Sequence, residues 1–491
     1  MNLRIRKTKN GSGNIGVQVV SRPNRKIRIE KHFGTAKNKE ELAALLRQAG
    51  IFINDQISTQ QLPFTAVTDE YFEQITLKNV FHNYAYEFLN KCYAKLGFDR
   101  INFQLLKDLA IIRIIEPSSK IRAIELLEEY FGIKYTKNRL YKELPDILNL
   151  KQSCEEIAID FSKKSFGFDF SLVFYDVTTL YFESFKEDNL KKCGFSKDNK
   201  FNQPQIVLAL MVTQQGFPIG YEIFEGSKFE GHTIIPVIKA FKQKYAIEKL
   251  TVVADAAMLS QSNLKELQDN KIDYLVGARL GNLPLSLITE FSKDLGRTEK
   301  KIFFKKLDHY YLICAFSQKR AYKDKSDREK QLLRANKLLE NPGQAFKKSK
   351  FIKNSSNNKL ELNNALITKA ELLEGIKGYA TNVSDIAPEL LISRYKDLWN
   401  IEKAFRIAKN DLEIRPVFLW TEIGIKSHIV IVFVSLCISK FLEIKTGLSI
   451  EAVRRMLWKV FDAELLDKVS NKTKTKRSLI PEKLQTIENC L

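Results

Sequence analysis

The chain has 491 residues, which is enough for about three domains. Its apolar content of 44%, with 33 Phe and 17 Tyr, excludes a chain that stays unfolded along its whole length. The 79 Lys and Arg outnumber the 58 Asp and Glu and give a net charge of +21. Such a charge favours a polyanionic partner, with nucleic acid ahead of a membrane surface, although it also fits simple solubility.

The distribution of this charge favours nucleic acid. Residues 1–50 hold 12 basic and 3 acidic residues, and residues 317–360 hold 13 basic and 4 acidic residues. Basic residues gathered in blocks are expected of surfaces that contact phosphates.

Other features of the composition exclude several protein classes. The six cysteines are scattered and form no CxxC pair, which argues against a zinc module or a disulfide framework. The N-terminal residues lack a signal-peptide pattern, so we expect a cytoplasmic protein. The longest uncharged apolar run, near Ile429–Ile438, is shorter than the about 20 residues that a membrane span needs. We therefore expect it to form a buried helix.

The N-terminal third divides into two predicted regions. Leu3–Ile5 and Ile15–Val20 alternate in polarity around a glycine turn, and a helical pattern follows, so residues 1–67 predict a small basic module with a β-hairpin. Residues 68–165 are mostly helical. Two of their helices, separated by Gly132, form a helix-turn-helix candidate that fits either DNA binding or an ordinary helical bundle.

The middle of the chain predicts an α/β core over residues 166–280. Ser171–Tyr175, Gln205–Val212 and Thr251–Ala254 are short apolar runs typical of strands buried on both faces. Residues 281–388 resemble an insertion, which we expect to be mainly β with a basic helical stretch.

The core pattern resumes over residues 389–445 with a predicted long helix, Pro388–Leu412. Residues 446–491 predict a C-terminal helical region with a basic tail.

Two predicted strands each end in an aspartate, Asp176 and Asp255. Ligands of α/β sheets bind beyond the ends of the strands, so paired carboxylates there indicate a functional site. For either aspartate alone, a helix cap or a turn is the favoured interpretation.

The predicted long helix carries a third carboxylate, Glu402. On a continuous helix, Tyr395, Trp399, Arg406 and Lys409 would share one side with it, next to an apolar stripe. Cations and aromatic rings around one carboxylate suit a metal site beside bound phosphates, whereas an ordinary Glu402–Arg406 surface pair is the alternative.

These residue types suit phosphodiester chemistry. Two Mg²⁺ ions about 4 Å apart activate an attacking oxygen and stabilise the leaving one, and carboxylates supply the hard oxygen ligands they need. The five histidines show no zinc-ligand spacing, and no GxxxxGK[ST] motif indicates ATP-driven chemistry.

The sequence resembles the DDE transposases of bacterial insertion sequences, in the group with a Tyr-x2-Arg-x3-Glu-x6-Lys signature. Tyr395, Glu402 and Lys409 match that signature, whereas Leu398 occupies the position of its arginine. The other matching segments are Phe174–Glu183, Gly216–Glu222 and Val253–Met258. The spacing of 79 residues from Asp176 to Asp255 and 147 from Asp255 to Glu402 agrees with members that carry an insertion before the glutamate helix.

The resemblance implies an RNase H-like fold with catalytic, metal-binding Asp176, Asp255 and Glu402 and two Mg²⁺ or Mn²⁺ ions. It also implies binding to terminal inverted repeats and target DNA, with oligomers on DNA in a bacterial cytoplasm. Tyr395 and Lys409 would hold phosphates beside Trp399, and Lys403 or Arg406 could replace the missing arginine. Two alternatives are an RNase H-like DNA nuclease without strand transfer and a non-catalytic DNA-binding regulator derived from a transposase. The three intact carboxylates argue against the regulator.

Overall fold

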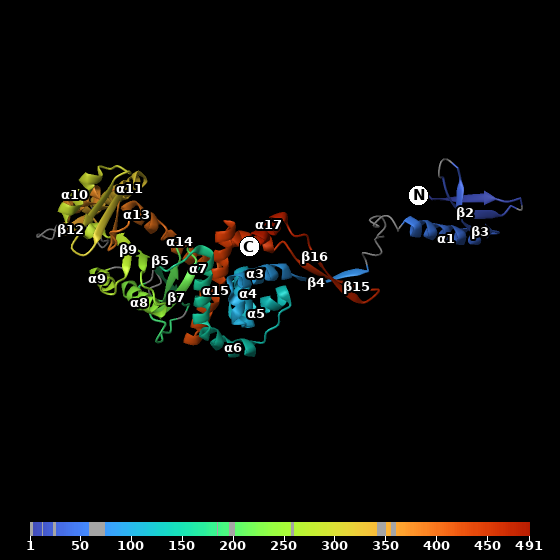
Figure 1. Cartoon of the computed structure of the whole chain (residues 1–491), viewed down its shortest axis with the longest axis horizontal. Helices are drawn as coiled ribbons and strands as arrows, with labels where there is room; N and C mark the ends of the chain where they lie inside the picture. Colours follow the sequence, from blue (N-terminus) through green and yellow to red (C-terminus); the bar gives the residue numbers. More distant parts are fainter. Residues whose placement is uncertain are drawn as a thin grey trace. The chain divides into compact units, whose positions relative to one another are not determined.

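The computed structural model forms two compact units (Figure 1). Unit 1 comprises Met1–Asn79 and Glu464–Thr475, and unit 2 comprises Val80–Ala463 and Lys476–Leu491. The boundary expected at residue 67 lies outside the described residues, so the module over 1–67 stays a prediction. The structure describes residues 3–11, 13–22, 26–57, 74–183, 185–195, 202–256, 260–340, 350–354 and 360–491.

Unit 1 begins with a three-stranded antiparallel sheet in the order β1-β2-β3. The hairpin expected between the first two strands is confirmed, and the amide of Gly13 donates to the carbonyl of Asn10 in its turn. The helix that follows packs its apolar side on Val17 and Val19 of the sheet. The elements are β1 (Arg4–Lys9), β2 (Ile15–Ser21), β3 (Arg28–Ala36) and α1 (Lys39–Ile57).

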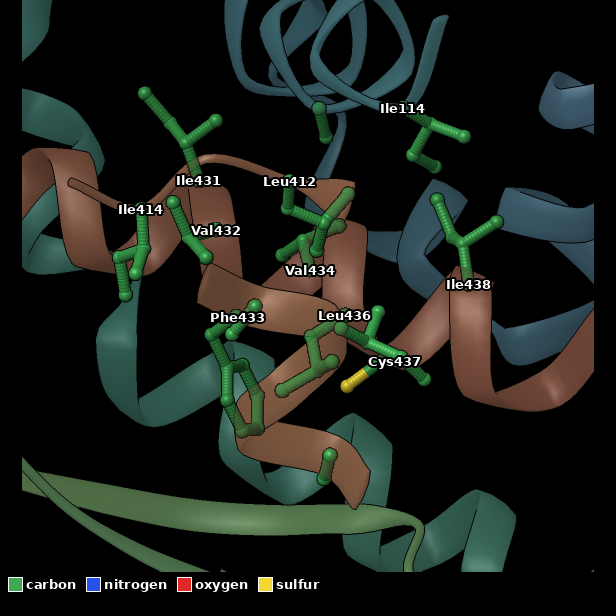
Figure 2. Close-up of a cluster of buried hydrophobic side chains, with 14 of the residues drawn as sticks. Ile114, Leu412, Ile414, Ile431, Val432, Phe433, Val434, Leu436, Cys437 and Ile438 are labelled. Carbon is green, nitrogen blue, oxygen red and sulfur yellow. The ribbon is translucent and has the colours of Figure 1, made fainter. Parts of the chain in front are cut away.

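The helices after residue 82 pack around one long apolar helix, α15 (Glu422–Thr446). This helix is long and apolar enough to cross a membrane, but 89% of its most apolar window is buried inside the protein. Figure 2 shows apolar side chains of α15, from Ile431 to Val434 and from Leu436 to Ile438, among those of neighbouring segments. The Ser435 hydroxyl donates to the carbonyl of Ala110 at 3.0 Å. Its neighbours are α3 (Asn83–Leu96), α4 (Gln104–Ile115), α6 (Lys137–Asn149) and α7 (Lys151–Phe166).

The helix-turn-helix candidate exists as two consecutive helices, α5 (Lys120–Phe131) and α6. Gly132 ends α5 in the left-handed conformation, and the Thr136 side chain caps α6 by accepting from the amide of Arg139. Because α6 packs on α15, the apolar side of this pair belongs to the core.

The central sheet of unit 2 has eight strands in the order β10-β11-β14-β9-β8-β5-β6-β7. Strands β5, β6 and β7 form an antiparallel meander, and β8 and β9 run parallel to β5. The α/β fold class expected from the sequence is therefore confirmed. The core strands are β5 (Leu172–Tyr181), β6 (Gln205–Val212), β7 (Pro218–Glu225), β8 (Thr251–Ala254) and β9 (Asp273–Ala278).

Both faces of this sheet are covered by helices, which explains the continuous apolar runs of its strands. Val173 and Tyr175 of β5 pack in the cluster with α8 (Ile234–Lys244) and α9 (Gln261–Asp269). Phe174, between them, joins the cluster on the opposite face, which includes α15.

Residues 281–388 extend the central sheet by three antiparallel strands, because β14 pairs with β9, β11 with β14 and β10 with β11. The described part of this insertion contains more helix than the sequence suggested. Its elements are α10 (Leu285–Leu295), β10 (Ile302–Lys306), β11 (Tyr311–Phe316), α11 (Gln318–Glu340), β12 (Ile352–Asn354), β13 (Leu360–Leu362), α12 (Asn364–Leu372) and β14 (Ile376–Thr381).

The single long helix expected over Pro388–Leu412 is wrong, because the segment forms three consecutive helical pieces. The amide of Leu398 donates to the carbonyl of Tyr395, and that of Asn400 to Asp397, so a tight turn separates the first two pieces. A helical wheel drawn through the whole segment therefore does not hold. The pieces are α13 (Pro388–Lys396), α14 (Trp399–Arg406) and a π-helical turn, η7 (Ile407–Asp411).

The C-terminal region is only partly helical, which corrects the helical region expected over 446–491. The alternating Lys and Thr residues of its basic tail form a strand, as alternation favours. This strand belongs to a second three-stranded sheet, in the order β16-β15-β4. The elements are β4 (Ile75–Phe81), α16 (Ile450–Leu457), β15 (Asp462–Asp467), β16 (Lys472–Arg477) and α17 (Glu482–Cys490).

Candidate active site

Asp176 and Asp255 occupy equivalent positions on neighbouring parallel strands. Strand β5 pairs with β8 from Leu172 opposite Thr251 to Phe174 opposite Val253, always with an offset of 79 residues. If this offset is continued for two residues beyond the paired segment, Asp176 falls level with Asp255, where β8 has just ended and β5 continues. Neighbouring strands lie about 4.8 Å apart, so the two carboxylates start from adjacent backbones.

The two aspartates also share their local geometry. Oδ1 of Asp176 accepts a hydrogen bond from the amide of Val177 at 2.8 Å, and Oδ1 of Asp255 accepts one from Ala256 at 2.7 Å. Each bond holds one oxygen against the chain. Ala257 and Met258, which the resemblance includes, lie outside the described residues.

Glu402 lies on the exposed side of α14, which packs on β5 and β6 through buried Ile401 and Phe405. The turn after β6 fixes the start of this helix. The side-chain amide of Asn400 donates to the carbonyl of Gln214 at 2.8 Å, and the Gln214 side chain donates to Asp397 at 2.8 Å. The third carboxylate is thus carried on a helix that lies over the strand of Asp176.

Tyr395 is buried, at 4% exposure, and its hydroxyl donates to Oδ1 of Asp255 at 3.5 Å. Helix α13 brings it there by packing on β8 and β9. Burial raises the pKa of Tyr395, and the nearby Asp255 and Glu402 raise it further. The tyrosine therefore stays protonated and able to donate.

Lys377 of β14 is a site residue that sequence reasoning missed. Its ammonium lies 4.6 Å from the centre of the Tyr395 ring. Burial and Arg320 lower the pKa of Lys377, whereas Asp255 and Glu402 act in the opposite direction. No sequence signal could have found it, because it is one of many lysines in the insertion.

A cavity of about 540 Å³ opens beside Asp255 and Tyr395. Two of its arginines are already paired: Arg320 with Asp324 at 3.3 Å and Arg328 with Glu374 at 2.6 Å. Lys377 also lines it, and among the described residues this lysine has no carboxylate within salt-bridge distance. The cavity therefore offers a cation near Asp255.

The remaining DNA-contact candidates lie further along the helical segment. Lys403 forms a salt bridge with Glu443 at 2.6 Å, and its ammonium lies 5.4 Å from the ring centre of Trp399, which is 53% exposed. Arg406 is exposed near the end of α14, and Lys409 is half-buried in η7.

Leu398, at the position of the signature arginine, is 7% exposed and packs in the core. It contributes packing to α14 and cannot contact a phosphate.

Three carboxylates without histidine suit a hard divalent cation such as Mg²⁺. Within the described part of the chain, however, no three His, Cys, Asp or Glu side chains lie close enough to hold one. The fold brings Asp176 and Asp255 to adjacent strand positions and carries Glu402 over the same strand, but it does not gather their oxygens into one cluster. Their chemistry fits a metal site.

Comparison with known proteins identifies the family to which this fold belongs. The family described as "Transposase DDE domain" matches residues 167–438, which is more than half of the chain. The chain belongs to this family, whose catalytic domain has an RNase H-like fold.

Solved structures of transposases are also similar to the chain. The piggyBac transposase synaptic complex with hairpin DNA is 12% identical, with a TM-score of 0.35 over 82% of this chain and 74% of that chain. The Mos1 transposase paired-end complex with left transposon end is 15% identical, with a TM-score of 0.16 over 32% and 53% of the two chains. The Mos1 strand transfer complex is 14% identical, with a TM-score of 0.16 over the same shares. A search of curated proteins finds no match.

Proposed function

We propose that the chain is the transposase of a bacterial insertion sequence. It binds the terminal inverted repeats of its element, cleaves DNA at their ends and joins the free 3′-OH to target DNA, acting in the cytoplasm as an oligomer on DNA. One observation supports the proposal: the register of β5 and β8, continued by two residues, brings Asp176 level with Asp255, and the helix of Glu402 packs on β5. The family match supports the same reaction class.

Asp176, Asp255 and Glu402 are the residues that would hold two Mg²⁺ or Mn²⁺ ions. Bound ions of this kind activate water or a 3′-OH and stabilise the leaving oxygen of a phosphodiester. Backbone hydrogen bonds fix the orientation of one oxygen in each of the two aspartates, Asp176 and Asp255.

The cations around these three carboxylates would bind the DNA phosphates. Lys377 and the hydroxyl of Tyr395 lie beside Asp255 and would contact the phosphate next to the scissile bond. Arg406 and Lys409, with Trp399, would extend the contact along the strand. Because Lys403 is paired with Glu443, its role would require that salt bridge to open.

The test is cleavage of labelled DNA that carries the element ends with their flanking sequence, in Mg²⁺ or Mn²⁺. Asp255→Asn removes one negative charge at constant size and should abolish nicking at the element tip. Asp308→Asn, at an exposed turn between β10 and β11, removes the same charge outside the site and should cleave like the wild type. Cleavage by Asp255→Asn at the wild-type rate would reject the assignment. Joining of the released 3′-OH to a second DNA separates a transposase from a nuclease.

A further inference from the structure

The three-stranded sheet of unit 1 has one covered face and one open face. Helix α1 packs against Val17 and Val19 of β2, so these side chains define the covered face. Ile5 of β1 pairs with Val19, and directly opposite residues share a face. Because successive side chains of a strand alternate, Arg4 and Arg6 lie on the open face.

The open face continues across all three strands. Arg6 pairs with Gln18 of β2, which in turn pairs with His32 of β3. A Cβ atom added to Gly16 would meet Oγ1 of Thr8 at 3.0 Å and Cε1 of His32 at 3.5 Å, so these two side chains also share this face. An arginine, an amide and an imidazole thus form a row across the sheet.

Positive charge is concentrated on the sheet and not on its helix. Strand β1 contains four basic residues and no acidic one, whereas α1 contains two basic and three acidic residues. Arg4 and Arg6 are exposed. Among the described residues neither has a carboxylate within salt-bridge distance, and the nearby Arg28–Glu30 contact spans 3.9 Å. Both guanidinium groups are available to an anionic partner.

We propose that the open face of this sheet, formed by Arg4, Arg6, Gln18 and His32, binds in the major groove of double-stranded DNA. The proposal rests on the proposed function, in which DNA is the partner. It adds the surface of the protein that contacts the DNA bases. The major groove is about 12 Å wide and admits a two-stranded β-ribbon, which β1 and β2 provide. The major groove of RNA duplexes is too deep and narrow for side chains to read.

The residue types on this face suit base recognition as well as phosphate contact. Arginine can donate two hydrogen bonds to the major-groove edge of guanine, and glutamine pairs in the same way with adenine. Val20 of β2 pairs with Arg4 on one side and with Ile29 of β3 on the other. The half-exposed Ile29 adds an apolar side chain that suits contact with a thymine methyl group.

The experiment measures binding of the full chain to a short mixed-sequence DNA duplex by fluorescence anisotropy at several salt concentrations. The double variant Arg4→Ala/Arg6→Ala should bind at least tenfold more weakly. For two lost phosphate contacts, the slope of the logarithm of the binding constant against the logarithm of the salt concentration should become shallower by up to about 1.8. The matched control, Lys39→Ala/Arg47→Ala, removes the same charge from exposed positions of α1 and should bind like the wild type.

A second duplex, whose cytosines carry bulky glucosyl groups in the major groove, identifies the groove. The wild type should bind it more weakly than the plain duplex, and Arg4→Ala/Arg6→Ala should not distinguish the two. Equal binding of the plain duplex by both double variants, or equal binding of the two duplexes by the wild type, would overturn the proposal. Element-end cleavage by the wild type would then leave the proposed function standing, whereas a wild type that binds no duplex would reject both.

Discussion

The hydroxyl of Tyr395 reaches within 3.5 Å of Oδ1 of Asp255 because residue 277, on β9, is a glycine. A Cβ atom at Gly277 would lie 2.7 Å from that hydroxyl and 3.0 Å from the Cβ of Ala256. The site therefore depends on the absence of a side chain on a neighbouring strand.

Gly277→Ala should displace the Tyr395 hydroxyl and lower cleavage by about tenfold or more, since small misplacements at reacting groups are costly. DNA binding should weaken less than cleavage, because the variant displaces the Tyr395 hydroxyl but leaves the cations of the site in place. The control is Gly281→Ala, where an added Cβ meets nothing within 4 Å. Equal cleavage by both variants would show that the Tyr395–Asp255 contact is not used.

Gly216 has a similar role at the helix of Glu402. It adopts φ +78°, and a Cβ there would lie 2.9 Å from the carbonyl oxygen of Asn400. Gly216→Ala should therefore shift the start of α14 and reduce cleavage, in addition to the roughly 1 kcal/mol of strain that a left-handed alanine costs.

Gly167→Ala is a control that introduces the same backbone strain without a steric contact. Gly167 also has a left-handed φ, +64°, but an added Cβ meets nothing within 4 Å. We expect both variants to lose unfolding free energy in denaturant titrations, with the larger loss and the activity defect in Gly216→Ala alone. Similar cleavage by the two would mean that the turn does not position Glu402.

The sequence predicts the sheet part of the site well, because strand periodicity is local. Asp255 directly follows β8 as expected, whereas the expected strand end at Asp176 is wrong, because β5 continues to Tyr181 through its pairing with β6. The offset of 79 residues between the two aspartates is then confirmed in the strand register.

The helical part could not be predicted, because its geometry depends on distant groups. The break at Leu398 is stabilised by the turn at Gln214, which contacts both Asp397 and Asn400. The salt bridge of Lys403 joins it to Glu443 on another helix. Lys377 reaches the site only because β14 pairs with β9, a long-range contact without a local signal.

Lys377 should contribute to phosphate binding, since Leu398 leaves the signature arginine missing and Lys377 lies next to the carboxylates. Lys377→Met should reduce cleavage of element-end DNA by about tenfold to a hundredfold, in line with the 1–3 kcal/mol of a charge-assisted contact. Lys319→Met, at an exposed position of α11, is the control. If Lys377→Met cleaves DNA as fast as this control, Lys377 does not bind the phosphate and other cations of the site must do so.

Leu398→Arg tests the opposite idea, that the family arginine could simply be restored. Because Leu398 packs in the core, a charged side chain there should lower the unfolding free energy by about 2 kcal/mol or more. Thermal unfolding measures this loss, and cleavage should fall with it. A stable variant with higher activity would show that the buried position can open towards DNA.

A buried basic cluster makes stability depend on pH. Nζ of Lys120 lies 3.1 Å from Nδ1 of His428, whose Nε2 contacts the carbonyl of Ile414. Burial and the neighbouring Arg113 hold the pKa of Lys120 well below its usual 10.5, and burial together with Lys120 lowers that of His428 well below 6.5. Both shifts favour the neutral form of each group in the folded chain.

The pKa of Lys120 is lower in the folded chain than its usual 10.5, so below about pH 10.5 the unfolded chain binds more protons at this group. The unfolding free energy should therefore rise with pH. The contribution of this group is up to about 1.4 kcal/mol per pH unit. Lys120→Met should remove that slope, and Lys95→Met, at an exposed position of α3, should keep it. Denaturant titrations between about pH 7 and pH 9 measure the slope. A slope unchanged in Lys120→Met would mean that Lys120 stays charged when buried, with His428 as its acceptor.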